Sequence, residues 1–163
     1  MKHTLMKTDK PISETGVTRY GRITWSSRKQ SCDLKARRIT PPIVDSLLPG
    51  EVFVFGTDVR GEHSYGAARF AFRELGAVKG RAEGPQGRCY AIPAEFPDPG
   101  DIKPCADRFE AYAKSHPELT FLVIPIGCGA AGHTPEEIAP LFAGASGLGN
   151  VCLPKAFWDA LNR

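Results

Sequence analysis

A glycine-rich stretch in the second half of the chain has the composition of a phosphate-binding loop. It covers residues 126–137 and carries glycine at positions 127, 129 and 132. Without side chains at those positions, backbone N–H groups can approach an anion closely. Thr134 and Glu137 have the spacing of a capping box, and Pro135 suits the first position of a helix. We therefore predict that a helix amino end faces this loop and favours a phosphate. A tight strand-to-helix turn without a ligand is the alternative.

A second glycine-rich loop, residues 55–69, follows an apolar run of β-branched and aromatic residues at 51–56. The carboxyl ends of neighbouring parallel strands meet at one edge of a sheet, so the two loops predict one shared pocket. The residues expected to bind the ligand come from both loops: Gly56, Thr57, Asp58, Gly66, Ala67, Gly127, Cys128, Gly129, Ala130, Ala131, Gly132 and His133.

Three side chains are candidates for acid–base chemistry. Asp58 directly follows the first apolar run, where its carboxylate can bind ribose hydroxyls, activate a water, or simply cap the turn. His63 can contact a phosphate or transfer a proton, or it is a solvated loop histidine. Glu83, in the glycine-rich stretch 77–87 that we interpret as a lid or pocket wall, is the second carboxylate candidate. Cys128, near the predicted helix amino end, is expected to have a lowered thiol pKa, but without a nearby base we interpret it as a packed residue.

The elements that must position these residues alternate along the chain. We expect strands at residues 51–56, 89–93, 119–126 and 150–153, and helices at 40–48, 65–75, 102–114, 135–143 and 155–161. This alternation predicts an α/β fold, a three-layer α/β/α sandwich with a mostly parallel sheet.

Composition favours one globular domain that follows a basic leader. The chain has 163 residues, of which 42% are hydrophobic and 24% are charged, far from disordered, fibrous or membrane classes. Residues 1–40 carry ten Lys/Arg and three Asp/Glu, whereas residues 41–163 carry eleven and fifteen. We expect a flexible leader over residues 1–37, in which the β-prone run 17–25 is a candidate edge strand, and an α/β domain over 38–163. With no apolar run of about 20 residues and no signal-like start, we expect a cytoplasmic protein without a membrane partner.

The cysteines and histidines do not predict a metal site. The five cysteines are an odd number without a CxxC pair, so we expect reduced and mostly buried thiols. The four histidines have no HxH or HExxH spacing, and the chain has no GxxxxGK[ST] loop for a nucleoside triphosphate. We predict neither a metal ion nor a cofactor.

The two loops together resemble the macrodomain superfamily, in particular macrodomain-like proteins of bacteria and their phages. The stretch 126–132, "IGCGAAG", is similar to the macrodomain loop "P-x-I-G-T-G-x-x-G" that wraps a diphosphate, with Pro125 one position later than the proline of that pattern. Gly66 and Ala67 open a helix as in the loop "N-x-A-N…G-G-G-x-A", and Asp58 stands where its second asparagine would be. Ala68 is the position nearest to the aspartate of one hydrolytic macrodomain type. The resemblance covers about residues 50–155 and implies a macrodomain-like fold that binds ADP-ribose.

Two classes of function are therefore expected. The first is binding of ADP-ribose or a related NAD-derived nucleotide, with hydrolysis by Asp58, Glu83 or His63 left open. A nucleotide sponge or hydrolase acting between phage and host is a variant that rests only on the resemblance. The second class is a nucleic-acid or protein interaction module that uses basic residues 1–40, with glycine loops that are only structural. The oligomeric state is not predicted.

Overall fold

A computed structural model describes residues 16–18, 21–23 and 33–163 of the chain. Its centre is a five-stranded sheet in the order β4-β5-β3-β6-β7, with parallel pairing except between β4 and β5. The strands of this sheet are β3 (Glu51–Thr57), β4 (Gly84–Gln86), β5 (Cys89–Pro93), β6 (Thr120–Val123) and β7 (Val151–Cys152). The predicted α/β class with a mostly parallel sheet is confirmed.

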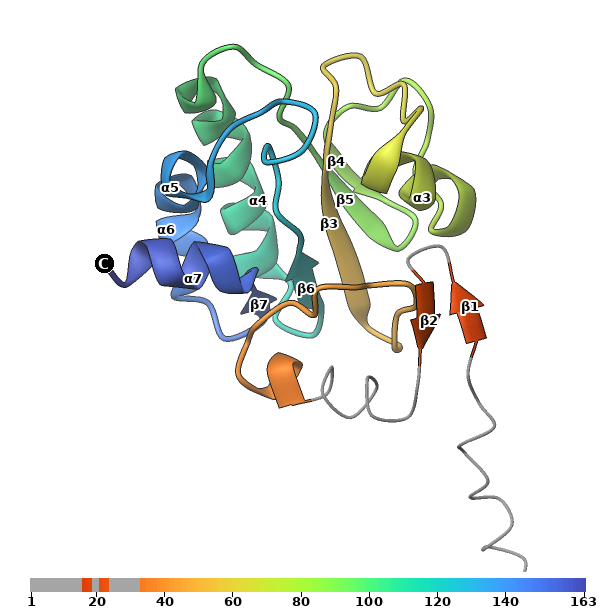
Figure 1. Cartoon of the computed structure of the whole chain (residues 1–163), viewed down its shortest axis with the longest axis horizontal. Coiled ribbons are helices and arrows are strands. Elements are labelled where there is room, and N and C mark those ends of the chain that lie inside the picture. Colours follow the sequence, from red (N-terminus) through yellow and green to blue (C-terminus); the bar gives the residue numbers. More distant parts are fainter. Residues whose placement is uncertain (1–15, 19–20, 24–32) are drawn as a thin grey trace, which may run out of the picture.

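Helices cover both faces of this sheet (Figure 1). On one face lies α3 (Gly66–Glu74). The other elements are η2 (Pro99–Ile102), α4 (Lys103–Ser115), α5 (Pro135–Ile138), η3 (Ala139–Phe142), α6 (Ala143–Ser146) and α7 (Lys155–Leu161). Most of them pack on the opposite face, an arrangement compatible with a three-layer sandwich.

The alternation of side chains along β3 explains why the sheet is buried on both faces. Val52 and Val54 pack with α4 and α7 in one hydrophobic cluster, whereas Phe53 and Phe55 pack with α3 in another. Successive residues of a strand point to opposite faces, so a continuous apolar run suits a strand that is covered twice. This burial fixes the register of β3 and therefore the place where its loop begins.

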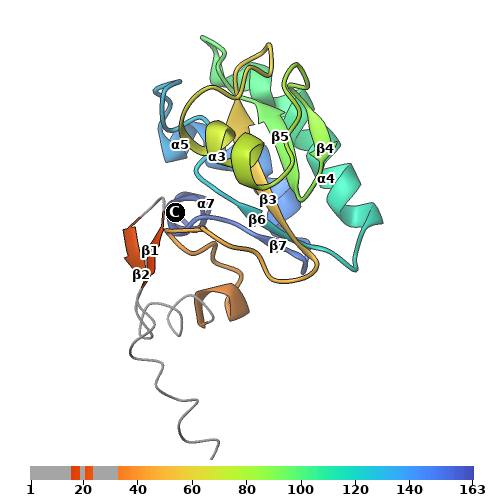
Figure 2. The same ribbon diagram turned by 90° about the vertical axis from the view of Figure 1, so that its right-hand side faces the viewer.

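The central strands β3 and β6 run in parallel, so the loops that follow them leave the sheet at the same edge. β5 is also parallel to β3, with Thr57 paired to Pro93 at its end. Three segments therefore meet at this edge: residues 57–66, residues 94–98 and residues 124–134. Figure 2 shows α3 in front of the strands, on the face of the sheet opposite to α4.

Three expectations about local structure are wrong. Residues 40–48 form no helix, because Ile39 makes a parallel bridge to Leu153 and the following chain continues without helical hydrogen bonds. The stretch 77–87 is not only a loop, since Gly84–Gln86 forms the antiparallel edge strand β4. The β-prone run near residue 17 gives β1 (Gly16–Thr18) and β2 (Gly21–Ile23), which pair with each other in a separate sheet.

The rest of the predicted leader, residues 1–15, 19–20 and 24–32, lies outside the described residues, and with it the expectation that it is flexible. Residues 33–36 form one helical turn, and Lys35 makes an ion pair with the buried carboxylate of Glu51. Within the described parts of the chain, no helix is long and apolar enough to span a membrane.

Candidate functional site

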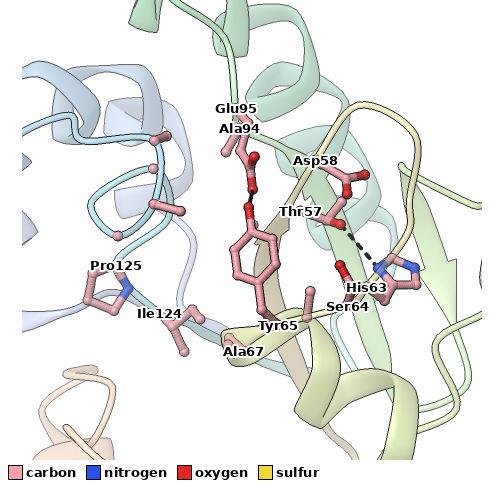
Figure 3. Close-up of a pocket in the computed structure, with 17 residues that line it drawn as sticks. Thr57, Asp58, His63, Ser64, Tyr65, Ala67, Ala94, Glu95, Ile124 and Pro125 are labelled. Carbon is pink, nitrogen blue, oxygen red and sulfur yellow. Dashed lines mark hydrogen bonds between the residues drawn. The ribbon is translucent and has the colours of Figure 1, made fainter.

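A cavity opens where the loops after β3, β5 and β6 meet (Figure 3), and we call it the two-loop cavity. Its volume is about 180 Å³. It is lined by Gly56, Thr57, Asp58, His63, Ser64, Tyr65, Gly66, Ala67, Ala68, Ala94, Glu95, Ile124, Pro125, Gly127, Gly129, Ala130 and Ala131. The structure therefore brings both predicted glycine loops to one cavity.

Most of the predicted ligand-binding residues line this cavity, but three do not: Cys128, Gly132 and His133. All three make contacts that hold the loop, and the backbone N–H of Gly132 donates to the Gly129 carbonyl at 3.0 Å. The backbone N–H of His133 donates to the carbonyl of Gly127 at 2.9 Å, and its ring Nε2 lies 2.8 Å from the carbonyl of Phe96. The backbone N–H of Cys128 donates to the Pro125 carbonyl. These bonds tie the loop after β6 to itself and to the segment after β5.

The tip of this loop is different, because the backbone N–H groups of Gly129, Ala130 and Ala131 have no hydrogen-bond acceptor among the described residues. Gly129 and Ala130 are also exposed. Backbone amides without internal partners need water or a ligand. Three such amides at a cavity wall are suited to bind an anion.

The helix amino end that faces the cavity belongs to α3 and not to α5. The predicted capping box of α5 is confirmed, since Thr134 and Glu137 bond to each other's backbone N–H groups. That end is thus satisfied by its own residues, and the Glu137 carboxylate already occupies it. By contrast, the N-cap residue of α3, Tyr65, makes no side-chain cap hydrogen bond, and Gly66, Ala67 and Ala68 of the first turn line the cavity. This uncapped turn has free N–H groups and a partial positive charge.

His63 is buried, and both of its ring nitrogens have partners. Nε2 lies 3.0 Å from the Val78 carbonyl, which can only accept, so Nε2 carries the proton. In the neutral ring, Nδ1 then accepts from the Thr57 hydroxyl at 3.1 Å (Figure 3). His63 also has a left-handed backbone, with φ of 52°. These contacts make His63 a support of the loop after β3 rather than a solvated acid or base.

Asp58 lies at the cavity and caps its own turn as well. Its Oδ1 accepts from the backbone N–H groups of Arg60 at 2.9 Å and Glu62 at 3.0 Å. Two hydrogen bonds hold the carboxylate in one orientation, which leaves Oδ2 as the oxygen available to a ligand. The predicted position of Asp58 at the site agrees with the structure, and its turn-capping alternative is also present.

Glu83 is not brought to the cavity. Its carboxylate forms a two-pronged ion pair with Arg108 of α4, with nitrogen–oxygen distances of 2.6 and 2.9 Å. The residue precedes the edge strand β4 and is absent from the cavity lining. The structure therefore does not place Glu83 beside Asp58 at this cavity, because the unpredicted strand β4 directs this segment to α4.

The expected activation of Cys128 is also wrong. Burial raises the pKa of this thiol, and the negative charges of Glu136 and Glu137 raise it further. The lowering expected from the helix end is not seen, because burial, the largest cause, and these two carboxylates all favour the neutral thiol. Cys128 packs against the main hydrophobic cluster, in agreement with the packed role that we infer from the sequence.

Two cavity residues, Tyr65 and Glu95, are not among the site residues predicted from the sequence. The Tyr65 hydroxyl donates a hydrogen bond to Glu95 Oε2 across the cavity, as Figure 3 shows. Glu95 follows β5, a strand whose loop carries no glycine signal. Only the parallel pairing of β5 with β3 identifies this carboxylate as a neighbour of the glycine loops.

The pair gives a direct prediction for tyrosine ionisation. The hydrogen bond to Glu95, partial burial, and the negative charges of Glu95 and Asp58 raise the pKa of Tyr65 to about 12. All of these favour the neutral phenol, so replacement Glu95→Gln should move the pKa back toward its ordinary value of about 10. The measurement is the absorbance of tyrosinate against pH, with a Tyr65→Phe protein in each background to isolate this residue. An unchanged Tyr65 titration in the Glu95→Gln protein would contradict the hydrogen bond.

A larger apolar cavity of about 980 Å³ adjoins the two-loop cavity. The two share Gly66, Ala67, Ile124 and Pro125, so the start of α3 and the end of β6 form the wall between them. The other lining residues are Leu34, Ile39, Thr40, Pro41, Pro42, Val44, Phe53, Arg69, Pro154, Lys155 and Ala156. Among the described residues, the buried Thr40 hydroxyl has no hydrogen-bond partner. Because of the shared residues, the two cavities are adjacent.

The fold and the site define an α/β protein with a cavity at the carboxyl edge of its sheet. Known protein-family models, curated proteins and solved structures were compared with the chain, and none of them matches it. Within the described ranges, no group of three or more His, Cys, Asp or Glu side chains is placed to hold a metal ion. The geometry of the site therefore carries the functional argument.

Proposed function

We propose that this protein binds ADP-ribose or a related NAD-derived nucleotide in the two-loop cavity, with the diphosphate between the start of α3 and the loop after β6. One observation carries the proposal. The first turn of α3, which has no side-chain cap, lines the same cavity as Gly129, Ala130 and Ala131, whose backbone N–H groups have no acceptor among the described residues. Both groups attract an anion through backbone dipoles, so a phosphate between them satisfies donors that otherwise need water.

The charged side chains that line the cavity determine how the nucleotide is oriented in it. Asp58 and Glu95 are the carboxylates of the lining, and neither Lys nor Arg belongs to it. Carboxylates repel phosphate but accept hydrogen bonds from hydroxyl groups. The sugar hydroxyls therefore face Asp58 and Glu95, while the phosphates lie against the backbone amides.

The apolar cavity suits the base of the same nucleotide. It begins on the other side of Gly66, Ala67 and Pro125, and Phe53 and Val44 contribute apolar surface. Arg69 and Lys155 line this cavity and supply the positive charge that the two-loop cavity lacks.

A thermal-shift screen of the full chain tests the proposal. The panel contains ADP-ribose, NAD, ADP, AMP, cyclic ADP-ribose and ribose phosphate. A ligand at a hundred times its dissociation constant stabilises the native state by about 2.7 kcal/mol. For a chain of this size, that amounts to a rise of about 5–10 °C in the melting temperature. We expect the rise with ADP-ribose; no shift with any nucleotide at millimolar concentration, confirmed by calorimetry, rejects the proposal.

Hydrolysis of the nucleotide would need an acid or base that faces the cavity. The imidazole of His63 is engaged by Thr57 and Val78, and Glu83 is paired with Arg108. Of the three predicted catalytic groups, only Asp58 presents an oxygen to the cavity. We therefore propose binding as the function and Asp58 as the group to test if ADP-ribose is turned over.

A further inference from the structure

The position of Tyr65 carries an inference that rests on the proposed function and goes beyond it. Tyr65 stands at the start of α3, belongs to neither hydrophobic cluster and is 47% exposed. Its ring lies, in the view of Figure 3, between the loop that contains Pro125 and the end of β3 with Thr57 and Asp58. The ring is therefore placed inside the site without being held there by core packing.

What holds the Tyr65 ring across the cavity is the hydrogen bond from its hydroxyl to Glu95. With the ring in this position the cavity volume is about 180 Å³. Cavities that hold drug-sized ligands usually measure about 300–1,000 Å³. Rotation of an exposed side chain such as Tyr65 needs no rearrangement of the core, so the cavity can enlarge by giving up this one hydrogen bond.

Glu95 is the group that gains a new partner when Tyr65 leaves. Asp58 keeps one oxygen on the amides of Arg60 and Glu62, whereas the Glu95 carboxylate accepts its hydrogen bond from Tyr65. A carboxylate that loses a donor in a partly buried site must find another. A sugar hydroxyl can donate to Glu95 as the phenol hydroxyl does. A terminal phosphate has no donor to offer and is repelled by the negative charge of Glu95.

We propose that Glu95 selects ligands that carry a hydroxyl-bearing group beyond the diphosphate, and that Tyr65 occupies Glu95 until such a group displaces it. The ligand class is a nucleoside diphosphate whose terminal phosphate carries a sugar. ADP shares the base, the first ribose and the diphosphate with ADP-ribose but lacks the second sugar. The Tyr65–Glu95 pair should therefore change the affinity for ADP-ribose relative to the affinity for ADP.

Calorimetric titration of the full chain with ADP-ribose and with ADP measures this ratio. Replacement Glu95→Gln should weaken ADP-ribose by about tenfold, the size of one charge-assisted hydrogen bond, and should leave ADP unchanged or slightly tighter. Replacement Tyr65→Phe removes the competing hydroxyl and should tighten ADP-ribose by about fivefold without affecting ADP. In the double variant, the gain from Tyr65→Phe should disappear, because it depends on Glu95.

The control for the lost charge is Glu62→Gln, since Glu62 is exposed and does not line the cavity. A second readout follows the ring itself. In protein with ¹³C-labelled tyrosine, the signal that Tyr65→Phe removes should move with ADP-ribose and stay in place with ADP.

The possible failures are distinguishable. If the wild-type protein binds neither nucleotide, the proposed function fails and this inference falls with it. If it binds them but both variants keep the wild-type affinity ratio, or the Tyr65 signal moves equally with the two ligands, the role of Tyr65 and Glu95 is wrong while the proposed function stands.

Discussion

Replacement Gly129→Glu should abolish nucleotide binding and leave the fold intact. A Cβ atom at Gly129 meets no atom within 4 Å, and this residue does not have the left-handed backbone that a side chain would strain. The new carboxylate would stand beside the unpaired amides of the loop tip. At about 4 Å from a phosphate and an effective dielectric constant of about 20, it would repel that phosphate by about 4 kcal/mol. We expect a loss of at least about 100-fold in affinity for ADP-ribose, measured by calorimetry.

The matched control is Gly149→Glu. Gly149 is also exposed, also has open space around an added Cβ, and precedes β7 away from the cavity. Both variants add the same charge and should keep the melting temperature of the wild-type protein, so only the position differs. Equal ADP-ribose affinity in the two variants would show that the loop after β6 does not hold the diphosphate.

Replacement Arg38→Ala should lower the stability of the folded protein strongly. The Arg38 guanidinium donates to the carbonyls of Ser146, Leu148 and Val151, and it lies 5.3 Å from the centre of the Trp158 ring. Hydrogen bonds from a charged donor contribute about 1.5–3 kcal/mol, and a carbonyl left unpaired in a partly buried site adds a penalty. We expect the free energy of unfolding to fall by about 3 kcal/mol in a urea titration.

The backbone conformation of Arg38 does not add to the difference between the wild-type protein and the Arg38→Ala variant. Its φ is 62°, and alanine experiences the same backbone strain as arginine there, so the substitution reports on the side chain alone. Arg37→Ala is the control, because Arg37 is the exposed neighbour. Similar stability losses in the two variants would mean that the guanidinium contacts contribute little.

The backbone contacts of the residues after Arg38 explain why the helix predicted at residues 40–48 does not form. Thr40 and the prolines after it suggested a helix start, but the Thr40 N–H donates to the Leu153 carbonyl and Ile39 pairs with Leu153. The chain there continues the sheet beyond β7. No local pattern reveals this pairing, because its partners are more than a hundred residues apart.

The predicted strands and helices of the main domain were largely confirmed because their signals are local. The apolar run at 51–56 became β3, and α7 begins and ends where its periodicity indicated. The capping box at Thr134 was also confirmed. The helix that was expected as one piece over residues 135–143 is divided into α5, η3 and α6, which a hydrophobic pattern alone does not separate.

The sequence by itself determined the α/β class, the parallel core strands and the two glycine loops at their ends, since strand burial, glycine conformation and helix caps depend on neighbouring residues. Only the tertiary structure decided which groups share the cavity. It brought Glu95 and Tyr65 together from separate elements, directed Glu83 to Arg108, and left α3 rather than α5 with the free helix end. The physical reason is that these contacts depend on strand order and on competition between hydrogen-bond partners distant in the chain, which no local spacing encodes.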